Sequence, residues 1–192
     1  MSVETGNVQV YHHQFTIADD ETNTMAVWIA GSLFDSGRGF ITVHTGVSSG
    51  PVELTVELLG DPPGTDAAID EWDNVEEGWL YGTEGLRIVN TNNGYAEGFE
   101  RLRQLDGSAH GVRVHSRGRG EAWDMIVDTP TEKYLIQLWP YPHPVTRREL
   151  KATDGIWTAE PAPDVEEPFD ELGADATVRL HGPVVSRPGE DF

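Results

Sequence analysis

The sequence of 192 residues contains no cysteine. This absence excludes disulfide bonds, zinc sites built on thiolates and thiol nucleophiles. Disulfides are rare in reducing compartments, so a chain without cysteine is compatible with the cytosol. We therefore expect a cytoplasmic protein.

Long apolar runs are also absent: no stretch approaches the roughly 18 residues that a transmembrane helix needs. The first ten residues, MSVETGNVQV, carry neither a positively charged segment nor an apolar core, so we expect no signal peptide. Helical periodicity is scarce, and no segment predicts an α-helix longer than two turns. These absences leave a β protein without a membrane span as the expected class.

Basic residues are few, and lysine occurs only at Lys133 and Lys151. Because 33 acidic residues face 13 basic ones, the formal net charge is −20. Such a field opposes direct binding to nucleic acid and to anionic membranes, and it favours a basic protein partner. Solubility or adaptation to high salt would produce the same composition, so these alternatives stay open.

Short apolar alternations between glycine and proline clusters predict the fold. In residues 52–58, Val52, Leu54 and Val56 should point inward while Glu53 and Glu57 point to solvent. About eight to ten such segments predict an all-β chain, a single-domain antiparallel β-sandwich with few short helical turns. The sandwich should span residues 1–150, and residues 151–192 should form an acidic C-terminal extension that packs on it or trails from it.

Several elements follow from local patterns. Residues 8–17 predict one strand with a bulge at the double histidine, and residues 40–44 and 52–58 predict a hairpin. Residues 25–33 are ambiguous between strand and helix. A helical turn is expected at residues 146–150 and an edge strand at residues 177–180.

Residues 111–140 predict a three-stranded meander, with residues 123–127 as its middle strand. Arg113, His115 and Arg117 alternate with valines and would line one open face, with Arg119 beside them. Arginine captures anions through paired, charge-assisted hydrogen bonds. These four residues are therefore the candidate anion-binding site, and pairing with acidic residues of the same chain is the structural alternative.

Other residue types give weaker signals. Histidines His12 and His13 could join His44 or His115 around a metal, but neighbouring residues on a strand face opposite ways. We expect no metal site, no cofactor and no catalytic residue. Tryptophan side chains could stack on bases or sugars or fill the core; they are Trp72, Trp79, Trp123 and Trp139.

The C-terminal segment from residue 154 onward holds ten acidic residues and two arginines. An inhibitor of a basic enzyme needs spaced carboxylates and an aromatic anchor. A solvated acidic tail is the alternative explanation. The candidate partner-binding residues are Glu166, Glu167, Phe169, Asp170 and Glu171.

Five local segments carry a resemblance to known proteins: residues 11–17 (YHHQFTI), 40–59, 74–89 and 105–107, with a looser match at 134–140. They resemble segments of the competence protein J family of small bacterial proteins. The resemblance implies an inhibitor of a competence-associated DNA-entry nuclease, with no catalytic role of its own. The segment 117–120 and the acidic tail have no counterpart in that family.

The sequence therefore predicts a non-catalytic protein-binding factor, an inhibitor or immunity-like protein that acts on a basic partner such as a nuclease or toxin. Two alternatives remain. One is a small-molecule or carbohydrate-binding enzyme that uses the Arg/His face of the sheet. The other is a structural or assembly protein whose acidic tail mediates contacts.

Overall fold

The computed structural model describes residues 2–19, 22, 33–64, 69–81, 85–90, 94–105, 109–143 and 147–156. By its internal contacts the chain divides into a unit spanning Met1–Glu160 and a unit spanning Pro161–Phe192. All described residues belong to the first unit. The expected strand at residues 177–180, the acidic tail and residues 25–32 lie outside the described residues.

The described part is all-β, with 57% strand and almost no helix, which confirms the expected class. Two short 3₁₀ turns occur, η2 (Ile69–Glu71) and η3 (Glu100–Gln104), and no described helix is long and apolar enough to cross a membrane. The strands are β1 (Ser2–Tyr11), β2 (Gln14–Ala18), β3 (Phe34–Gly37), β4 (Phe40–His44), β5 (Ser49–Leu58), β6 (Asn74–Tyr81), β7 (Arg87–Asn90), β8 (Gly94–Tyr95), β9 (Ala109–Arg117), β10 (Lys133–Pro140) and β11 (Arg148–Ala152).

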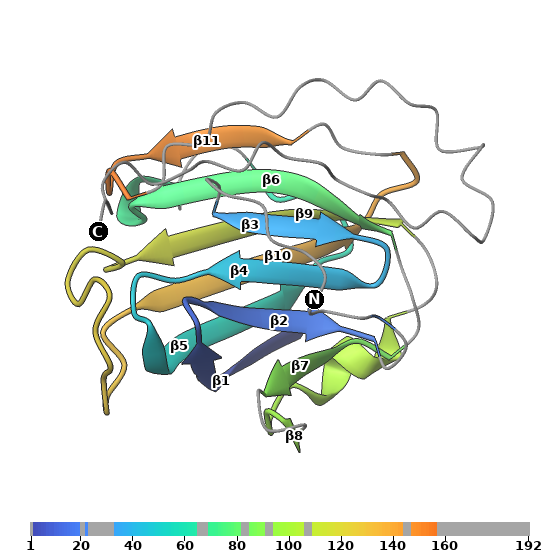
Figure 1. Ribbon diagram of the computed structural model, residues 1–192. Coiled ribbons are helices and arrows are strands. Elements are labelled where there is room, and N and C mark those ends of the chain that lie inside the picture. Colours follow the sequence, from blue (N-terminus) through green and yellow to red (C-terminus); the bar gives the residue numbers. More distant parts are fainter. Residues whose placement is uncertain are drawn as a thin grey trace, which may run out of the picture. The chain divides into compact units, whose positions relative to one another are not determined.

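These strands form one hydrogen-bonded sheet in the order β11-β6-β9-β10-β5-β1-β2-β4-β3, with β7 paired to β2 and β8 to β7. The sheet is open and curled, so that β2, β3 and β4 lie in front of β5, β9 and β10 in Figure 1. A sandwich of two separate sheets is not confirmed. The pairing is also not wholly antiparallel, because β10 runs parallel to β5.

The core lies inside the curl and follows the alternation of β5. Val52, Leu54 and Val56 are fully buried, while Glu53 lies partly exposed on the other face. Neighbouring β10 contributes Ile136 in register with Val56. A side chain of this size contributes roughly 1.5–3 kcal/mol when fully buried. The inward and outward positions predicted for residues 52–56 are thus confirmed.

The double histidine is a turn rather than a bulge. Tyr11 pairs with Gln14, and the two residues between them have positive φ angles, 52° at His12 and 60° at His13. Consecutive positive φ angles are those of the tight hairpin turn that matches the twist of two strands. The expected single strand 8–17 is therefore the hairpin of β1 and β2.

The predicted hairpin of residues 40–44 and 52–58 is wrong, although both strands exist. Strand β4 pairs with β2 and β3, while β5 pairs with β1 and β10. The β1–β2 hairpin lies between β4 and β5, because β2 pairs with β4 and β1 pairs with β5. The described residues of the expected helical turn, 147–150, likewise do not form one, because β11 begins at Arg148 and pairs with β6.

The predicted meander has two strands, β9 and β10, joined by the β9–β10 loop, residues 118–132. Its expected middle strand, residues 123–127, is a turn region with one isolated bridge, between Ser49 and Ile126. Residues on either side of positions 65–68 contact the outer face of β9: the ring of Trp72 packs on His115, and the carbonyl of Gly64 accepts a hydrogen bond from Arg113. Strand β9 is therefore buried on both faces.

Candidate functional site

The four residues of the predicted anion site do not share an open face. Arg113, His115 and Arg119 are only 4%, 1% and 2% exposed, and of the four only Arg117 is exposed. The prediction of an open Arg/His row is wrong, because Gly64 and Trp72 cover Arg113 and His115 on this side of the sheet. Anion binding itself stays a prediction.

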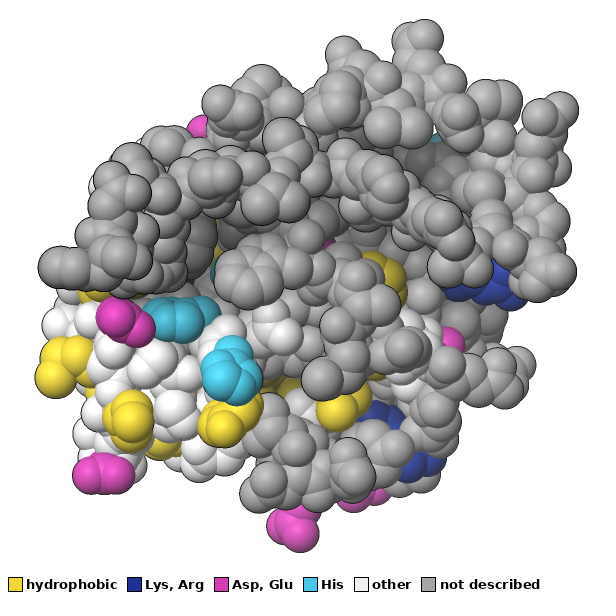
Figure 2. All heavy atoms as spheres, viewed as in Figure 1, with side chains coloured by type: hydrophobic (Ala, Val, Ile, Leu, Met, Phe, Trp, Pro, Cys, Tyr) yellow, Lys and Arg dark blue, Asp and Glu magenta, His cyan; other side chains and the backbone are white. Residues whose placement is uncertain are grey.

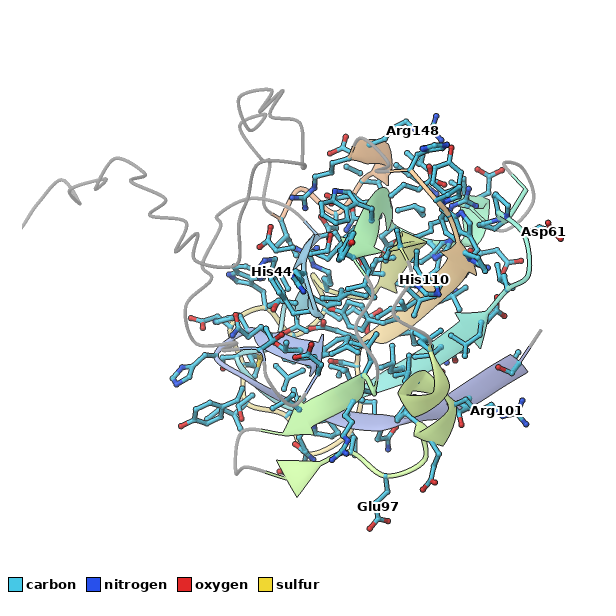
Figure 3. The ribbon with its side chains drawn as sticks, turned by 90° about the vertical axis from the view of Figure 1, so that its right-hand side faces the viewer. His44, Asp61, Glu97, Arg101, His110 and Arg148 are labelled. Atoms are coloured by element: carbon cyan, nitrogen blue, oxygen red, sulfur yellow. The ribbon has the colours of Figure 1, made fainter. Side chains whose placement is uncertain are left out.

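Arg113 is neutralised within the chain. Its Nε and Nη2 donate to Glu77 Oε1 at 2.7 and 2.5 Å, and its Nη1 donates to the Gly64 carbonyl at 2.8 Å. Arg148 Nη2 reaches Glu77 Oε2 at 2.7 Å; Figure 3 shows Arg148 at the outside of the molecule. Burying charges is tolerable only with such pairing. The donors of the Arg113 guanidinium are therefore occupied within the chain, and little capacity is left for a ligand.

His115 lies beside this pair in a closed environment. Its ring is 5.3 Å from the ring of Trp72, and Nδ1 donates to the Leu135 carbonyl at 3.2 Å. The pKa of His115 is lowered to about 4, chiefly because burial disfavours the charged ring; the nearby charge of Arg113 adds to this shift, and the Leu135 hydrogen bond and the charge of Glu77 oppose it. The imidazole is therefore neutral near pH 7.

Arg119 lies at the start of the β9–β10 loop, beside the residues that follow β11. Its Nε is 3.4 Å from Asp154 Oδ2, and its Nη2 donates to the Ile156 carbonyl at 3.2 Å. Asn74 donates to the same Asp154 carboxylate. This guanidinium therefore ties residues 154–156 to the sheet.

A buried carboxylate, Glu132, holds the loop after β4. It accepts from the backbone N–H groups of Gly46 at 3.1 Å and Val47 at 2.5 Å, and from the Tyr134 hydroxyl. Burial raises the pKa of Glu132, although these three hydrogen bonds oppose the shift. Burial and the neighbouring Glu132 raise the pKa of Tyr134 well above its ordinary value. This arrangement fixes the backbone of the loop.

Sequence reasoning missed a second polar network around Asp35. Its carboxylate meets His44 Nε2 at 2.8 Å and Arg147 Nη1 at 3.3 Å, and Arg147 Nη2 donates to Glu76 at 2.9 Å. No local motif could reveal it, because its members come from four separate segments. The network borders a cavity of about 130 Å³, lined by Phe34, Asp35, Ser36, Gly78, Trp79 and Arg147. Its acids and bases engage one another, which favours a structural role.

The histidines weighed as metal ligands are held apart in different contacts. His13 Nε2 lies 3.0 Å from Asp124 Oδ1, whereas His44 pairs with Asp35 and His115 packs under Trp72. Within the described residues no group of three or more His, Asp or Glu side chains is arranged to hold a metal ion.

The tryptophans considered as a stacking platform lie in different environments. Trp139 is buried, where its ring packs directly against the backbone of Gly111, and Trp123 is exposed. The partner-binding residues predicted in the tail lie outside the described residues, so their prediction stands as it was. They are Glu166, Glu167, Phe169, Asp170 and Glu171.

Comparison with known proteins gives no family match and no match to a curated protein. Two solved structures are similar. One is ComJ from Bacillus subtilis, an inhibitor of the DNA degrading activity of NucA, with a TM-score of 0.46 and 10% identity over 73% of this chain and 100% of that chain. The other is crocagin biosynthetic gene J, with a TM-score of 0.47 and 14% identity over 72% of this chain and 97% of that chain. These similarities are weak, and no family membership is shown.

Proposed function

We propose that this chain is a non-catalytic protein-binding factor that acts on a basic protein partner. The supporting observation is how its charges are used. Arginines at 113, 119 and 147 pair with acidic groups of the same chain, while the net charge stays at −20. Because these cations are occupied internally, the excess acid is what a partner meets. A field of this sign attracts a positively charged surface and repels nucleic acid.

Within this proposal, the finer candidate for the partner is a nuclease, and the chain would act as its inhibitor. Nucleases that bind a polyanionic backbone carry a basic groove, and spaced carboxylates can occupy such a groove. The acidic tail supplies spaced carboxylates around one aromatic side chain. The residues proposed to carry this contact are Glu166, Glu167, Phe169, Asp170 and Glu171.

The test is capture of host proteins on the immobilised chain at low salt, followed by kinetics with each purified basic protein that is retained. Raising salt from about 0.01 M to about 1 M shortens the Debye length from about 30 Å to about 3 Å. We therefore expect the association rate to fall at least about tenfold over this range. Inhibition of DNA degradation by a retained nuclease would support the finer candidate.

Two variants of the tail, compared with one control, test whether the tail carries the contact with the partner. Replacing Glu166, Glu167, Asp170 and Glu171 together by their amides should slow association, while Phe169→Ala should speed dissociation. Arg117→Gln is the matched control, because this exposed cation should not attract a basic partner. If no purified basic protein binds, or if association is indifferent to salt, the excess acid serves solubility or life at high salt, and the proposed function fails.

A further inference from the structure

The β9–β10 loop exposes large apolar side chains at one end of the sheet. Trp123, Met125 and Ile126 are 42%, 57% and 77% exposed, whereas Ala122 beside them is buried. Figure 2 shows hydrophobic side chains on the surface on the side where this loop lies in Figure 1, with acidic and histidine side chains beside them. Large exposed apolar side chains that gather on one surface mark interaction sites.

The loop is held in place by its neighbours, so the exposure is built into the fold. Its backbone forms a ladder of hydrogen bonds with residues 46–49, the segment between β4 and β5. The bonds run from Asp124 N to Gly46 O at 2.9 Å, from Ser48 N to Met125 O at 2.9 Å and from Val127 N to Ser49 O at 3.0 Å.

A second set of contacts locks the segment on which the loop rests. Glu132 holds the N–H groups of Gly46 and Val47. A Cβ at residue 46 would lie 1.9 Å from the Arg119 carbonyl oxygen, so the two backbones touch, as only glycine allows. Preorganised side chains lose less entropy when a partner binds, which raises affinity.

The apolar surface continues onto the β1–β2 hairpin. Ser49 pairs with Tyr11 on one side and bridges to Ile126 on the other, so the three side chains share one face of the sheet. Tyr11 is also exposed, and two strand spacings place it about 10 Å from Ile126. Trp123 packs its ring 5.6 Å from that of His13 in the same hairpin. Aromatic and methionine side chains in such an arrangement are those that dominate protein interfaces.

Acidic groups surround this surface. Glu121, Asp124 and Asp128 are exposed in the same loop. His13 contacts Asp124 at 3.0 Å and the Gly46 carbonyl at 3.2 Å, so it joins the loop to the hairpin. A fitting partner would have an apolar pocket inside a basic rim, because opposite charges across a rim favour encounter and register.

We propose that Trp123, Met125 and Ile126, with Tyr11 at their edge, form the docking surface for a basic protein. This inference rests on the proposed function and assigns it a second contact besides the tail. The acidic rim and the net charge disfavour an anionic membrane, and two copies of a chain charged −20 repel each other. A basic protein is therefore the occupant that the charges favour.

The first experiment places a photo-reactive phenylalanine analogue at position 126 or, as a control, at position 3. Val3 is an exposed hydrophobic residue too, and it lies eight residues from Tyr11 along β1, about 26 Å away. Cross-linking from position 126 and not from position 3 to a basic protein, identified and then purified, is the expected result. A cross-link to a second copy of this chain, or to none, would overturn the proposal.

The second experiment measures binding of that purified protein to Ile126→Asp, Trp123→Ala and the control Val3→Asp. Loss of a central interface residue should weaken binding at least about thirtyfold, while Val3→Asp should bind like the wild type. Thermal unfolding should remain close to that of the wild type in Ile126→Asp and Val3→Asp, because at least half of each side chain is exposed, whereas Trp123→Ala also loses the packing of its ring on His13. If the basic protein binds all variants equally, the docking surface is wrong and the proposed function stands; if it binds none, including the wild type, both fail.

Discussion

The buried imidazole of His115 should make the stability of this protein depend on pH in one direction. Its folded pKa of about 4 lies below its ordinary value of 6.5, because burial disfavours the charged ring. Between pH 4 and pH 6.5, the unfolded chain therefore binds a proton at His115 that the folded chain does not bind. The stabilisation is complete above pH 6.5, declines as pH falls towards 4, and is absent below pH 4.

The size of the effect follows from the shift. Each pH unit between the two values changes the free energy of unfolding by about 1.4 kcal/mol, so the whole contribution is about 3 kcal/mol. Between about pH 7.5 and about pH 5 the loss should be about 2 kcal/mol. Urea unfolding at both pH values measures it, with His115→Gln as the reference. This variant removes the titrating ring and keeps a donor for the Leu135 carbonyl.

Other groups contribute to acid sensitivity, so the comparison between the two proteins matters more than either curve. Glu132 acts in the opposite direction, because its raised pKa lets the folded state take up a proton before the unfolded state does. Its effect is present in both proteins and cancels in their difference. Parallel stability curves for the wild type and His115→Gln across this pH range would refute the reasoning.

Two further predictions concern packing. Leu54→Ala should cost roughly 2–5 kcal/mol in unfolding free energy because Leu54 is fully buried, whereas Glu57→Gln keeps an acceptor for Gln137 and should change it by no more than about 0.5 kcal/mol; equal costs in chemical denaturation would contradict the register. Gly46→Ala should lower the free energy of unfolding by about 1–3 kcal/mol, because its Cβ would clash with the Arg119 carbonyl. Gly60→Ala should be nearly neutral in chemical denaturation, because the space around Gly60 is open. Similar losses of stability in both variants would refute the contact between Gly46 and Arg119.

Local alternation predicted strands well where one face meets the core and the other meets solvent. Strand β5 is such a case, and its inward residues are those that the pattern indicated. Strand β9 has the same alternation, but Arg113 is covered by Gly64 and His115 by Trp72. The pattern of β9 therefore identified the strand and misjudged its second face. Covering by a distant segment leaves no mark in the strand itself.

Strand pairing was harder to predict than strand position. The parallel pair of β5 and β10 joins segments about 80 residues apart, and no turn sequence marks it. The β1–β2 turn carries two histidines where asparagine and glycine usually supply positive φ. Residues 123–127 have the composition of a strand, since tryptophan, isoleucine and valine favour one. They form an exposed loop instead, and their backbone hydrogen bonds to other segments go to residues 46–49 rather than to β9 or β10.

The charge and the apolar surface of this chain are expected to affect binding at different stages. Arg113 and Arg119 lie inside, where removing the partner of a buried ion costs about 3–5 kcal/mol, and a carboxylate lies beside each. The outer surface keeps the acidic excess, and Trp123 and Ile126 interrupt it. The acidic field acts over roughly a Debye length and affects how fast a basic partner arrives, whereas apolar contacts act only at touching distance and affect how slowly it leaves. Tail variants should therefore change mainly association and loop variants mainly dissociation, and this division separates the two proposed contacts even when both bind one partner.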